Sequence, residues 1–424
     1  MKKLTAIILG YGMRGQAYAK YAVNVPEELE IVAVADKEES RRDYAKKLHS
    51  LPDNMVVDNW KKLTSLPKMA DFAIIATQDN MHLEPALECI EKGYNLLLEK
   101  PIAPTAKECK EITLAAEKKG VKVIVCHVLR FTALFRTIKD IIDRGELGDI
   151  MSVMHTENVG HLHYSHSFVR GNWRNSEESS PMILAKSCHD TDLIQWLIGK
   201  KCTKVQSFGS LQHFKCENQP EGAPDYCLMG CPHSDECFYE PVRFYVENKK
   251  NPWRDTVADK VNATDEEILA ALKDGPYGRC VYKCDNNVID RQVVNMEFED
   301  GCTVSFTLAT LNKGGRFIRI YGTRGELIAS MDTTSSMSIY SYDTQETKDI
   351  EVDKIDQGIA SGHGGGDTGI MFDTIRAFSN DVPSKSVTDI RTSYLNHLIA
   401  FAAEESRLSS IVINMDEFEK NIVV

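Results

Sequence analysis

The chain has 424 residues, of which 42% are hydrophobic and 26% charged, and this composition is ordinary for a globular protein with room for two sizeable cores. Its formal net charge of −12 argues against nucleic acid or an anionic membrane surface as the main partner. The N-terminal apolar run is too short to span a membrane and ends at glycines, so we expect a β-strand there, and a cytoplasmic location.

Residues 5–36 have the pattern of a dinucleotide-binding unit: an apolar run, the glycine spacing GxGxxG, a helical stretch and a second apolar run. Gly10 permits the tight turn, Gly12 lets the backbone approach a pyrophosphate, and Gly15 lets the helix pack closely on the strand. The free N–H groups at the start of the helix suit phosphates. The predicted cofactor contacts of this unit are Gly10, Tyr11, Gly12, Met13, Arg14, Gly15 and Asp36.

Asp36 decides which dinucleotide we expect. Its carboxylate can accept hydrogen bonds from the adenosine ribose and would repel a 2′-phosphate, which favours NAD over NADP. The nearby Lys37, Arg41 and Arg42 act in the opposite direction.

The alternation of strands and helices then continues. Continuous apolar strands are expected within 70–82, 94–102 and 121–131, with helices over 83–93 and 106–120. This order predicts a parallel, doubly wound Rossmann sheet whose ligands bind at the carboxyl ends of the strands. The polar residues expected there are Asp36, Thr77, Gln78, Asp79, Asn80, Glu99, Lys100, Cys126 and His127.

The chain changes character near Arg130, so we divide it into a NAD-binding domain at 1–128 and a substrate-binding domain at 129–424. Segments 292–311 and 316–330 alternate in polarity around Asp-Gly and Arg-Gly turns, and 337–354 extends them. They predict an α+β domain with a large, open, mostly antiparallel sheet. A glycine-rich loop and closing helices are expected over 358–424.

A stretch rich in His, Arg and aromatic residues, 153–175, suits a polar ligand because Arg offers paired hydrogen bonds and Trp a stacking face. A metal bound by its histidines and plain loop packing are the alternatives. The predicted substrate contacts here are His163, His166, Arg170, Trp173 and Arg174.

Several cysteines follow in a loop that contains Pro and Gly. Cys227, Cys231, Cys237 and Cys280 could close a tetrahedral site for a structural zinc ion, with an iron–sulfur cluster as the alternative. The spacing is not that of a tight zinc knuckle, and reduced thiols packed as small hydrophobic groups would give the same pattern.

The motifs "GYGMRG", "ATQDNMH", "LLLEKPIA" and "CHDTDLIQWL" together resemble the glucose-fructose oxidoreductase / inositol dehydrogenase / MocA family across nearly the whole chain. The resemblance implies hydride transfer between a nicotinamide and a sugar, polyol or related hydroxyl compound. It places Lys100 beside the nicotinamide and His189 opposite it as acid or base. It also implies that Thr77, Asn80 and His82 line the cofactor loop, and that an open sheet face pairs subunits into a dimer or tetramer.

The residues themselves support a role for Lys100. A lysine at a strand end can stabilise an alkoxide, and a cis bond to Pro101 could aim it inward.

Near Met182 a helix begins in which Lys186, His189 and Asp190 could converge on a substrate, with Asp192 orienting His189. Many family members carry an Asp four residues before this His.

Here that position is Ala185, so Lys186 is expected to add a substrate or acid–base group. A satisfied core histidine and a lysine that reaches water are the alternatives for His189 and Lys186.

We therefore expect an NAD-dependent dehydrogenase that acts on a hydroxyl of a sugar, sugar acid or cyclitol. One alternative is a glycoside hydrolase that oxidises, eliminates and reduces again with a recycled NAD. The other is a dinucleotide-binding regulator without catalysis.

Overall fold

Six short apolar strands form the first sheet, in the order β3-β2-β1-β4-β5-β6, and all of its pairs are parallel. The structure is a computed structural model that describes residues 3–332, 335–352 and 365–424. The central strands are buried on both faces, which explains their continuous apolar sequences. The predicted doubly wound sheet is confirmed. Its strands are β1 (Leu4–Leu9), β2 (Leu29–Ala35), β3 (Val56–Val57), β4 (Phe72–Ile75), β5 (Asn95–Leu98) and β6 (Val123–Val125).

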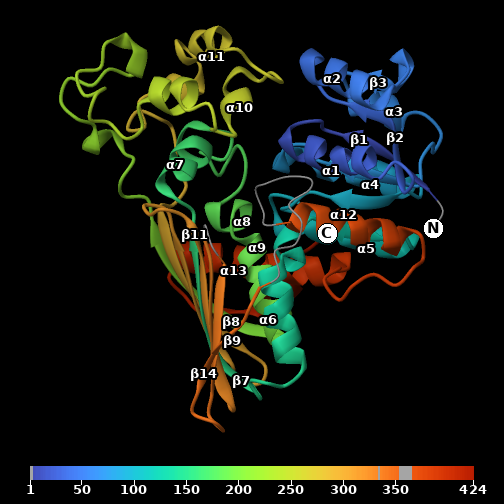
Figure 1. The fold of residues 1–424 in the computed structure, drawn as a ribbon, viewed down its shortest axis with the longest axis vertical. Coiled ribbons are helices and arrows are strands. Elements are labelled where there is room, and N and C mark those ends of the chain that lie inside the picture. The colour runs from blue at the N-terminus through green and yellow to red at the C-terminus, as the bar shows by residue number, and fades with distance from the viewer. Residues whose placement is uncertain (1–2, 333–334, 353–364) are drawn as a thin grey trace.

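Helices cover both faces of this sheet (Figure 1). Five of them follow strands of this sheet; α1, α4 and α5 were predicted, whereas α2 and the short α3 were not. They are α1 (Met13–Asn24), α2 (Glu39–His49), α3 (Trp60–Thr64), α4 (Leu83–Glu91) and α5 (Ala106–Lys119). A late helix, α12 (Gly366–Phe378), joins them, because Ile370, Met371 and Phe378 belong to the same apolar cluster as Tyr18.

Nine strands form the second sheet, in the order β14-β13-β12-β11-β7-β10-β9-β8-β15. Only the pair β7–β10 is parallel, so the predicted large, mostly antiparallel sheet is confirmed. Its strands are β7 (Ile150–Asn158), β8 (Cys202–Ser210), β9 (Arg291–Phe298), β10 (Thr303–Ala309), β11 (Gly315–Gly322), β12 (Gly325–Met331), β13 (Ser336–Ser341), β14 (Thr347–Asp349) and β15 (Ile413–Asn414).

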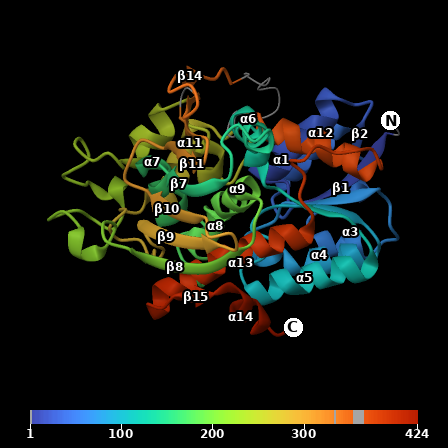
Figure 2. The same cartoon turned by 90° about the horizontal axis from the view of Figure 1, so that it is seen from below.

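One face of the second sheet is covered and the other is open. Figure 2 shows the covering helices between this sheet and the first domain. They are α6 (Ala133–Asp143), α8 (Met182–Ala185), α9 (Cys188–Ile198), α13 (Ile390–Ser409) and α14 (Met415–Lys420). On the opposite face large apolar side chains are exposed: Met154, Phe208, Val293 and Phe317. Buried and exposed residues alternate along β9 accordingly.

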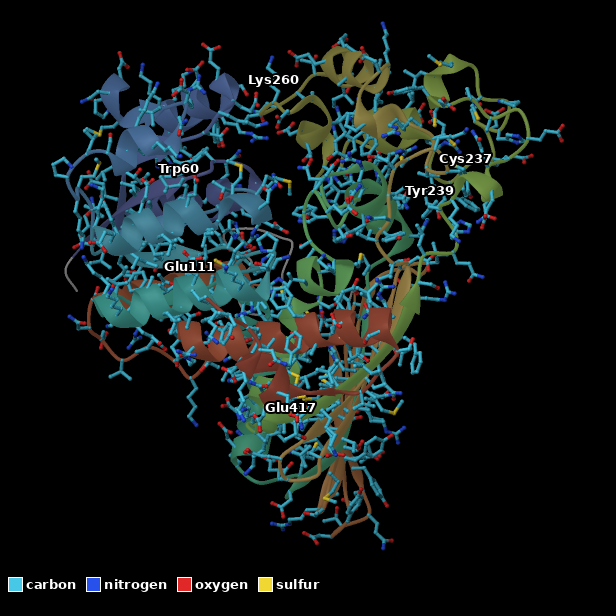
Figure 3. The ribbon with its side chains drawn as sticks, turned by 180° about the vertical axis from the view of Figure 1, so that it is seen from behind. Trp60, Glu111, Cys237, Tyr239, Lys260 and Glu417 are labelled. Carbon is cyan, nitrogen blue, oxygen red and sulfur yellow. The ribbon has the colours of Figure 1, made fainter. Side chains whose placement is uncertain are left out.

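Between β8 and β9 the chain forms an insertion, residues 211–290, which contains α10 (Arg254–Ala258) and α11 (Asp265–Leu272) beside α7 (His161–Tyr164). Figure 3 shows Cys237 and Tyr239 of this insertion on the far side of the molecule from Trp60. The insertion also reaches the first domain. Thr256 Oγ1 lies 3.5 Å from Met13 Sδ, and Asp259 is ion-paired with Arg41.

No helix in the parts of the chain described above is long and apolar enough to cross a membrane.

Candidate active site

The glycine turn after β1 has the geometry that a dinucleotide requires. Gly10 has a φ of 93°, and a Cβ there would lie 2.5 Å from the Ala76 carbonyl oxygen. A Cβ on Gly15 would lie 2.1 Å from the Gly10 oxygen, so α1 can pack on the turn only without a side chain. A Cβ on Gly12 would come no closer than 3.9 Å to any other residue, that residue being Arg41. The backbone at Gly12 can therefore be approached by a pyrophosphate.

Asp36 lies at the end of β2 beside this turn. Its Oδ2 accepts a hydrogen bond from the Tyr11 N–H at 2.6 Å, and its Oδ1 accepts one from the Glu38 N–H at 2.9 Å. The guanidinium of Arg42 donates instead to the Asp36 and Lys37 carbonyls. A carboxylate has further lone pairs, so Asp36 can still accept hydrogen bonds from ribose hydroxyls.

Two of the predicted cofactor contacts form an ion pair beneath the turn. Arg14 Nε lies 2.6 Å from Glu99 Oε1, and Arg14 Nη2 lies 2.6 Å from Asp367 Oδ1 on α12. The Tyr18 hydroxyl donates to the same Glu99 oxygen at 2.5 Å. Burial alone would raise the pKa of Glu99, but the Arg14 charge and hydrogen bond lower it below the usual range. Glu99 is therefore an ionised group that joins β5 to α1, and Arg14 extends this connection to α12.

Lys100 follows Glu99 at the end of β5, and the Lys100–Pro101 bond is cis, as the sequence suggested. Its Nζ donates to the Ala185 carbonyl at 2.7 Å, which places the amine against the junction of α8 and α9. The Ile102 N–H donates to His397 Nε2 at 3.1 Å and holds the next residues from α13. The second domain thus holds both the Lys100 amine, at Ala185, and the backbone that follows it, at His397.

The loop after β4 is attached to the residue that follows Lys100. His82 lies between two carbonyls, with Nδ1 at 2.8 Å from the Pro101 oxygen and Nε2 at 3.2 Å from the Thr77 oxygen. Asn80 donates from Nδ2 to the Glu178 carbonyl at 3.0 Å. Gln78 precedes the short turn Asp79–Met81. A cofactor contact from Thr77, Gln78, Asn80 or His82 stays a prediction.

His189 lies in the first turn of α9 and is 5% exposed. Its ring centroid is 6.2 Å from that of His127, which follows β6. Neither ring nitrogen of His127 has a hydrogen-bond partner among the described residues, and burial lowers its pKa to about 4. His127 is also close enough to Lys100 for its positive charge to contribute to that lowering. His189 thus borders a neutral imidazole on which the charge of Lys100 also acts.

Lys186 belongs to a buried network of charges that the sequence did not indicate. Its Nζ lies 3.3 Å from Glu157 Oε1, and Arg316 Nη2 lies 2.7 Å from Glu157 Oε2. Glu157 and Arg316 face each other across strands β7 and β11. Burial lowers the pKa of Lys186, Glu157 opposes that shift, and the charges of Arg316 and Lys100 add to it. Lys186 is therefore an amine whose proton is more easily lost than usual.

Two carboxylates on α9 are committed to other partners. Asp190 is fully buried, and its Oδ1 lies 2.9 Å from Arg316 Nε and 2.8 Å from His155 Nε2. Burial alone would raise the pKa of Asp190, but the charges and hydrogen bonds of Arg316 and His155 together lower it below its usual range. We therefore reassign Asp190 from substrate contact to positioning.

The other carboxylate, Asp192, was expected to orient His189. It instead accepts two hydrogen bonds from Arg130, at 2.6 and 2.7 Å, and one from Asn396 at 2.6 Å. It thus anchors α9 to the segment after β6 and to α13.

The residues of the predicted substrate loop contact different parts of the protein. His163 and His166 stack on Trp253 of the insertion, with ring centroids 5.2 and 4.8 Å away. Trp173 donates from Nε1 to Asp79 at 2.9 Å, so this part of the loop does lie beside the cofactor loop.

The two arginines of that loop are held elsewhere. Arg174 makes two hydrogen bonds to Asp285, at 2.9 and 3.0 Å. Arg170 is buried and donates to the carbonyls of Arg279 and Tyr239. We reassign Arg170 as well, since these contacts turn it toward the insertion.

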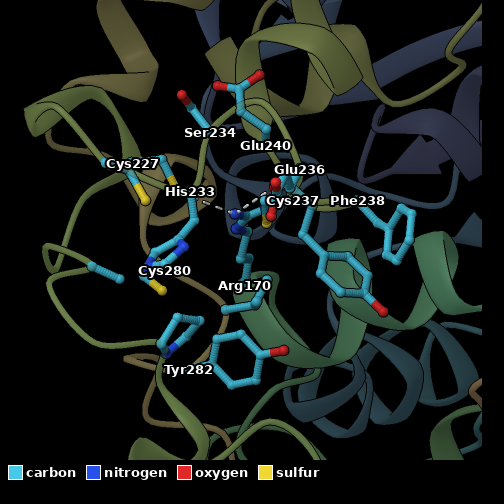
Figure 4. A pocket seen from close by; sticks show the side chains of 15 residues that line it. Arg170, Cys227, His233, Ser234, Glu236, Cys237, Phe238, Glu240, Cys280 and Tyr282 are labelled. Atoms are coloured by element: carbon cyan, nitrogen blue, oxygen red, sulfur yellow. Dashed lines mark hydrogen bonds between the residues drawn. The ribbon is translucent and has the colours of Figure 1, made fainter.

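Cys227, Cys231, Cys237 and Cys280 line one pocket in the insertion (Figure 4). As their side chains are placed, no three His, Cys, Asp or Glu residues of the described chain form a ligand set for a metal ion. A metal at these cysteines stays a prediction.

Two family models match the chain. "Oxidoreductase family, NAD-binding Rossmann fold" matches residues 4–127, and "Oxidoreductase family, C-terminal alpha/beta domain" matches residues 139–396.

Curated relatives match parts of the chain. It is 24% identical over 315 residues to the putative oxidoreductase YteT of Bacillus subtilis, a match that covers 72% of this chain and 71% of that one. It is 33% identical over 172 residues to scyllo-inositol 2-dehydrogenase (NADP(+)) IolW of the same organism, covering 40% and 44%. It is 26% identical over 204 residues to the 2,7-anhydro-N-acetylneuraminate hydratase of Escherichia coli, covering 48% and 51%. The last two matches thus span about half of each relative or less.

Solved structures share the whole fold. A levoglucosan dehydrogenase in complex with NADH and L-sorbose superposes with a TM-score of 0.71 at 16% identity, covering 98% of this chain and 99% of that one. A putative NADPH-dependent oxidoreductase from Desulfitobacterium hafniense superposes with a TM-score of 0.70 at 16% identity, covering 99% of both chains.

Proposed function

Because the chain belongs to the Gfo/Idh/MocA oxidoreductase family, we propose that it is an NAD-dependent dehydrogenase acting on a hydroxyl of a sugar, sugar acid or cyclitol. The observation that carries the proposal is the position of Lys100. Its amine donates to the carbonyl of Ala185, at the α8–α9 junction and four residues before His189. When bound, the nicotinamide accepts or gives the hydride that the substrate carbon exchanges.

The protein residues have separate tasks in this proposal. Gly12 and the start of α1 hold the pyrophosphate, and Asp36 binds the ribose hydroxyls, which favours NAD. Lys100 donates a hydrogen bond to the substrate oxygen and stabilises negative charge on it. His189 takes the hydroxyl proton, because it is the buried imidazole at the start of α9.

Lys186 suggests what distinguishes this site within the family. Ala185 stands where many members carry an Asp, and the adjacent Lys186 brings a second amine near Lys100. The amines of Lys100 and Lys186 and the guanidinium of Arg316 supply three basic groups here. The two carboxylates beside them, Glu157 and Asp190, are already paired. This charge balance favours a substrate that carries a carboxylate.

An oxidation–elimination glycoside hydrolase, which recycles its NAD, is the second candidate. The absent Asp favours it because the usual proton-transfer group is replaced by an amine. The name of the E. coli relative, a hydratase, also describes a reaction without net redox change.

Turnover of a substrate panel separates these candidates. Sugars, sugar acids, inositols and aryl glycosides are incubated with NAD while NADH absorbance and aglycone release are both followed. We expect stoichiometric NADH from a sugar acid and no aglycone release. Aglycone release without NADH accumulation supports the hydrolase instead.

The Lys100→Met variant tests the assigned role. It should lose about 10²- to 10³-fold in kcat/KM, because it removes the hydrogen-bond donor that stabilises the substrate oxygen. NAD binding, measured by calorimetry, should change little, and Lys348→Met on the exposed strand β14 is the matched control. Full activity of Lys100→Met would contradict catalysis at this site and favour the regulator without catalysis.

We also propose that two or four copies associate through the open face of the second sheet. Apolar side chains such as Phe208, which is 59% exposed, gather there, and exposed apolar patches of this kind mark association surfaces. The domain limits at residue 128 and a cytoplasmic location remain our predictions, and residues 358–364 of the glycine-rich loop lie outside the described chain.

A further inference from the structure

Five of the twelve cysteines lie between residues 227 and 284, within the insertion. Four of them line a pocket of about 240 Å³: Cys227, Cys231, Cys237 and Cys280. Figure 4 shows Cys227, Cys237 and Cys280 around the side chain of Arg170. The proposed hydride transfer uses none of them, so the cluster needs its own explanation.

The local backbone brings these four residues together. A short 3-10 helix begins at Cys227, and Gly230 with a φ of 82° turns the chain so that the Cys231 N–H reaches the Cys227 carbonyl at 3.4 Å. The Cys280 N–H donates to the Asp225 carbonyl at 2.8 Å, and Tyr226 forms a β-bridge with Arg279. Cys227 and Cys280 therefore lie on adjacent chain segments, although 53 positions separate them in sequence.

Arg170 is a buried cation without a carboxylate partner in the described chain. It is 1% exposed, its Nε and Nη2 donate to the carbonyls of Arg279 and Tyr239, and its Nη1 has no hydrogen-bond partner. A buried guanidinium is costly unless a negative charge lies nearby. The groups around it that can become negative are Tyr245 and several cysteines, and among the cysteines Cys227 Sγ lies 3.8 Å from Nη2.

The insertion has only a small apolar core of its own, and Phe214, Tyr239 and Val281 anchor the cysteine segment in the main core. Its own cluster contains seven buried residues between Phe244 and Tyr277. The preceding residues 211–241 form only short 3-10 turns and loops. Segments with so small a core usually require a disulfide or a metal to fold stably.

We propose that Cys227, Cys231, Cys237 and Cys280 bind one Zn²⁺ ion as four thiolates, and that Arg170 balances the charge of this complex. Binding releases four protons, one from each thiol, and gives a complex of charge −2 that the guanidinium partly neutralises, with no oxidation or reduction. The thiols must turn inward from their present placement, a change between staggered side-chain rotamers. The pocket between them provides the space for this change.

Zinc suits this set better than an iron–sulfur cluster. Four-thiolate zinc sites are tetrahedral and closed, and they stabilise loops that have no core of their own. The zinc site would fix Arg170 and the segment around it. Trp173, three residues later, contacts Asp79 beside the cofactor loop.

Elemental analysis of the full-length protein, expressed with zinc in the medium and purified under reducing conditions, tests the proposal. We expect about one zinc per chain, with sulfur scatterers at about 2.3 Å in X-ray absorption. Cys227→Ser and Cys280→Ser should each reduce the zinc content at least fivefold. Cys216→Ser, at an exposed thiol that does not line the pocket, is the matched control and should keep its zinc.

Three results would overturn the proposal: wild-type protein with less than about a tenth of an equivalent of zinc, iron in its place, or zinc retained in Cys227→Ser. Loss of zinc in Cys284→Ser would overturn the ligand assignment, since we expect that variant to keep it. If the variants fail to fold, Co²⁺ exchanged into wild-type protein should give the intense thiolate charge-transfer bands of a tetrahedral site. These measurements need no substrate, so their outcome is independent of the proposed dehydrogenase activity.

Discussion

Mild acid should destabilise this protein through its buried histidines. Burial lowers the pKa of His127 to about 4 and that of His397 to about 3. The unfolded chain binds protons at these positions from about pH 6.5 downward, whereas the folded chain does not. Stability from a lowered histidine pKa is therefore present above pH 6.5 and is lost as the pH falls toward the folded value.

The size of the effect follows from these values. For a folded pKa of about 4 or below, each histidine lowers the free energy of unfolding by about 1.8 kcal/mol between pH 7 and pH 5. The two together give about 3.6 kcal/mol, a large share of the 5 to 15 kcal/mol typical of folded proteins. Carboxylates with lowered pKa values, such as Glu99, stay ionised in this range and do not contribute.

Urea unfolding at pH 7 and pH 5, followed by fluorescence, measures the loss. The His397→Gln variant can keep the hydrogen bond from Ile102 N–H but cannot be protonated, so its loss should be about 1.8 kcal/mol smaller than that of wild type. His161→Gln removes a partly exposed imidazole and is the control. An equal acid loss in His397→Gln and wild type would refute the reasoning.

Three further predictions follow from the same contacts. Gly15→Ala should abolish NAD binding or lower the thermal midpoint by several degrees, since its Cβ would lie 2.1 Å from the Gly10 oxygen; calorimetry on a soluble variant that still binds NAD normally would contradict this. Asp36→Ala should weaken NAD at least tenfold and shift the ratio of kcat/KM values toward NADP, because the repulsion of a 2′-phosphate is removed; an unchanged ratio would show that Asp36 does not read the ribose. Phe208→Asp should reduce the oligomer measured by light scattering while activity per chain in the remaining oligomer is kept, and an unaltered mass would exclude this part of the sheet from the interface.

The first domain could be predicted well because its signals are local. Buried strands produce continuous apolar runs, and the turn at Gly10 and Gly15 is specified by neighbouring residues. The same locality makes Lys100 recognisable at the end of β5, since strand, carboxylate, lysine and proline follow one another.

The charge network around Lys186 could not be predicted in this way. Glu157 and Arg316 pair because β7 and β11 are neighbours in the second sheet, and that order is not written in the local sequence. A weak signal existed, since His155 and Glu157 alternate along β7 as inward-facing polar residues. That Arg170 turns toward the insertion could not be predicted for a related reason: a loop rich in Arg and Trp says nothing about the direction in which each side chain points.

The ion pairs of Arg14 have a consequence for anyone who divides this protein. Arg14 connects α1 to Glu99 in the same sheet and to Asp367, more than 350 positions later. A fragment that stops at residue 128 would lose that second carboxylate and would expose to solvent the surface on which Ile370, Met371 and Phe378 now rest. The nucleotide-binding half is completed by the far end of the polypeptide, so excising it should yield an aggregating fragment rather than a small, independent nucleotide binder.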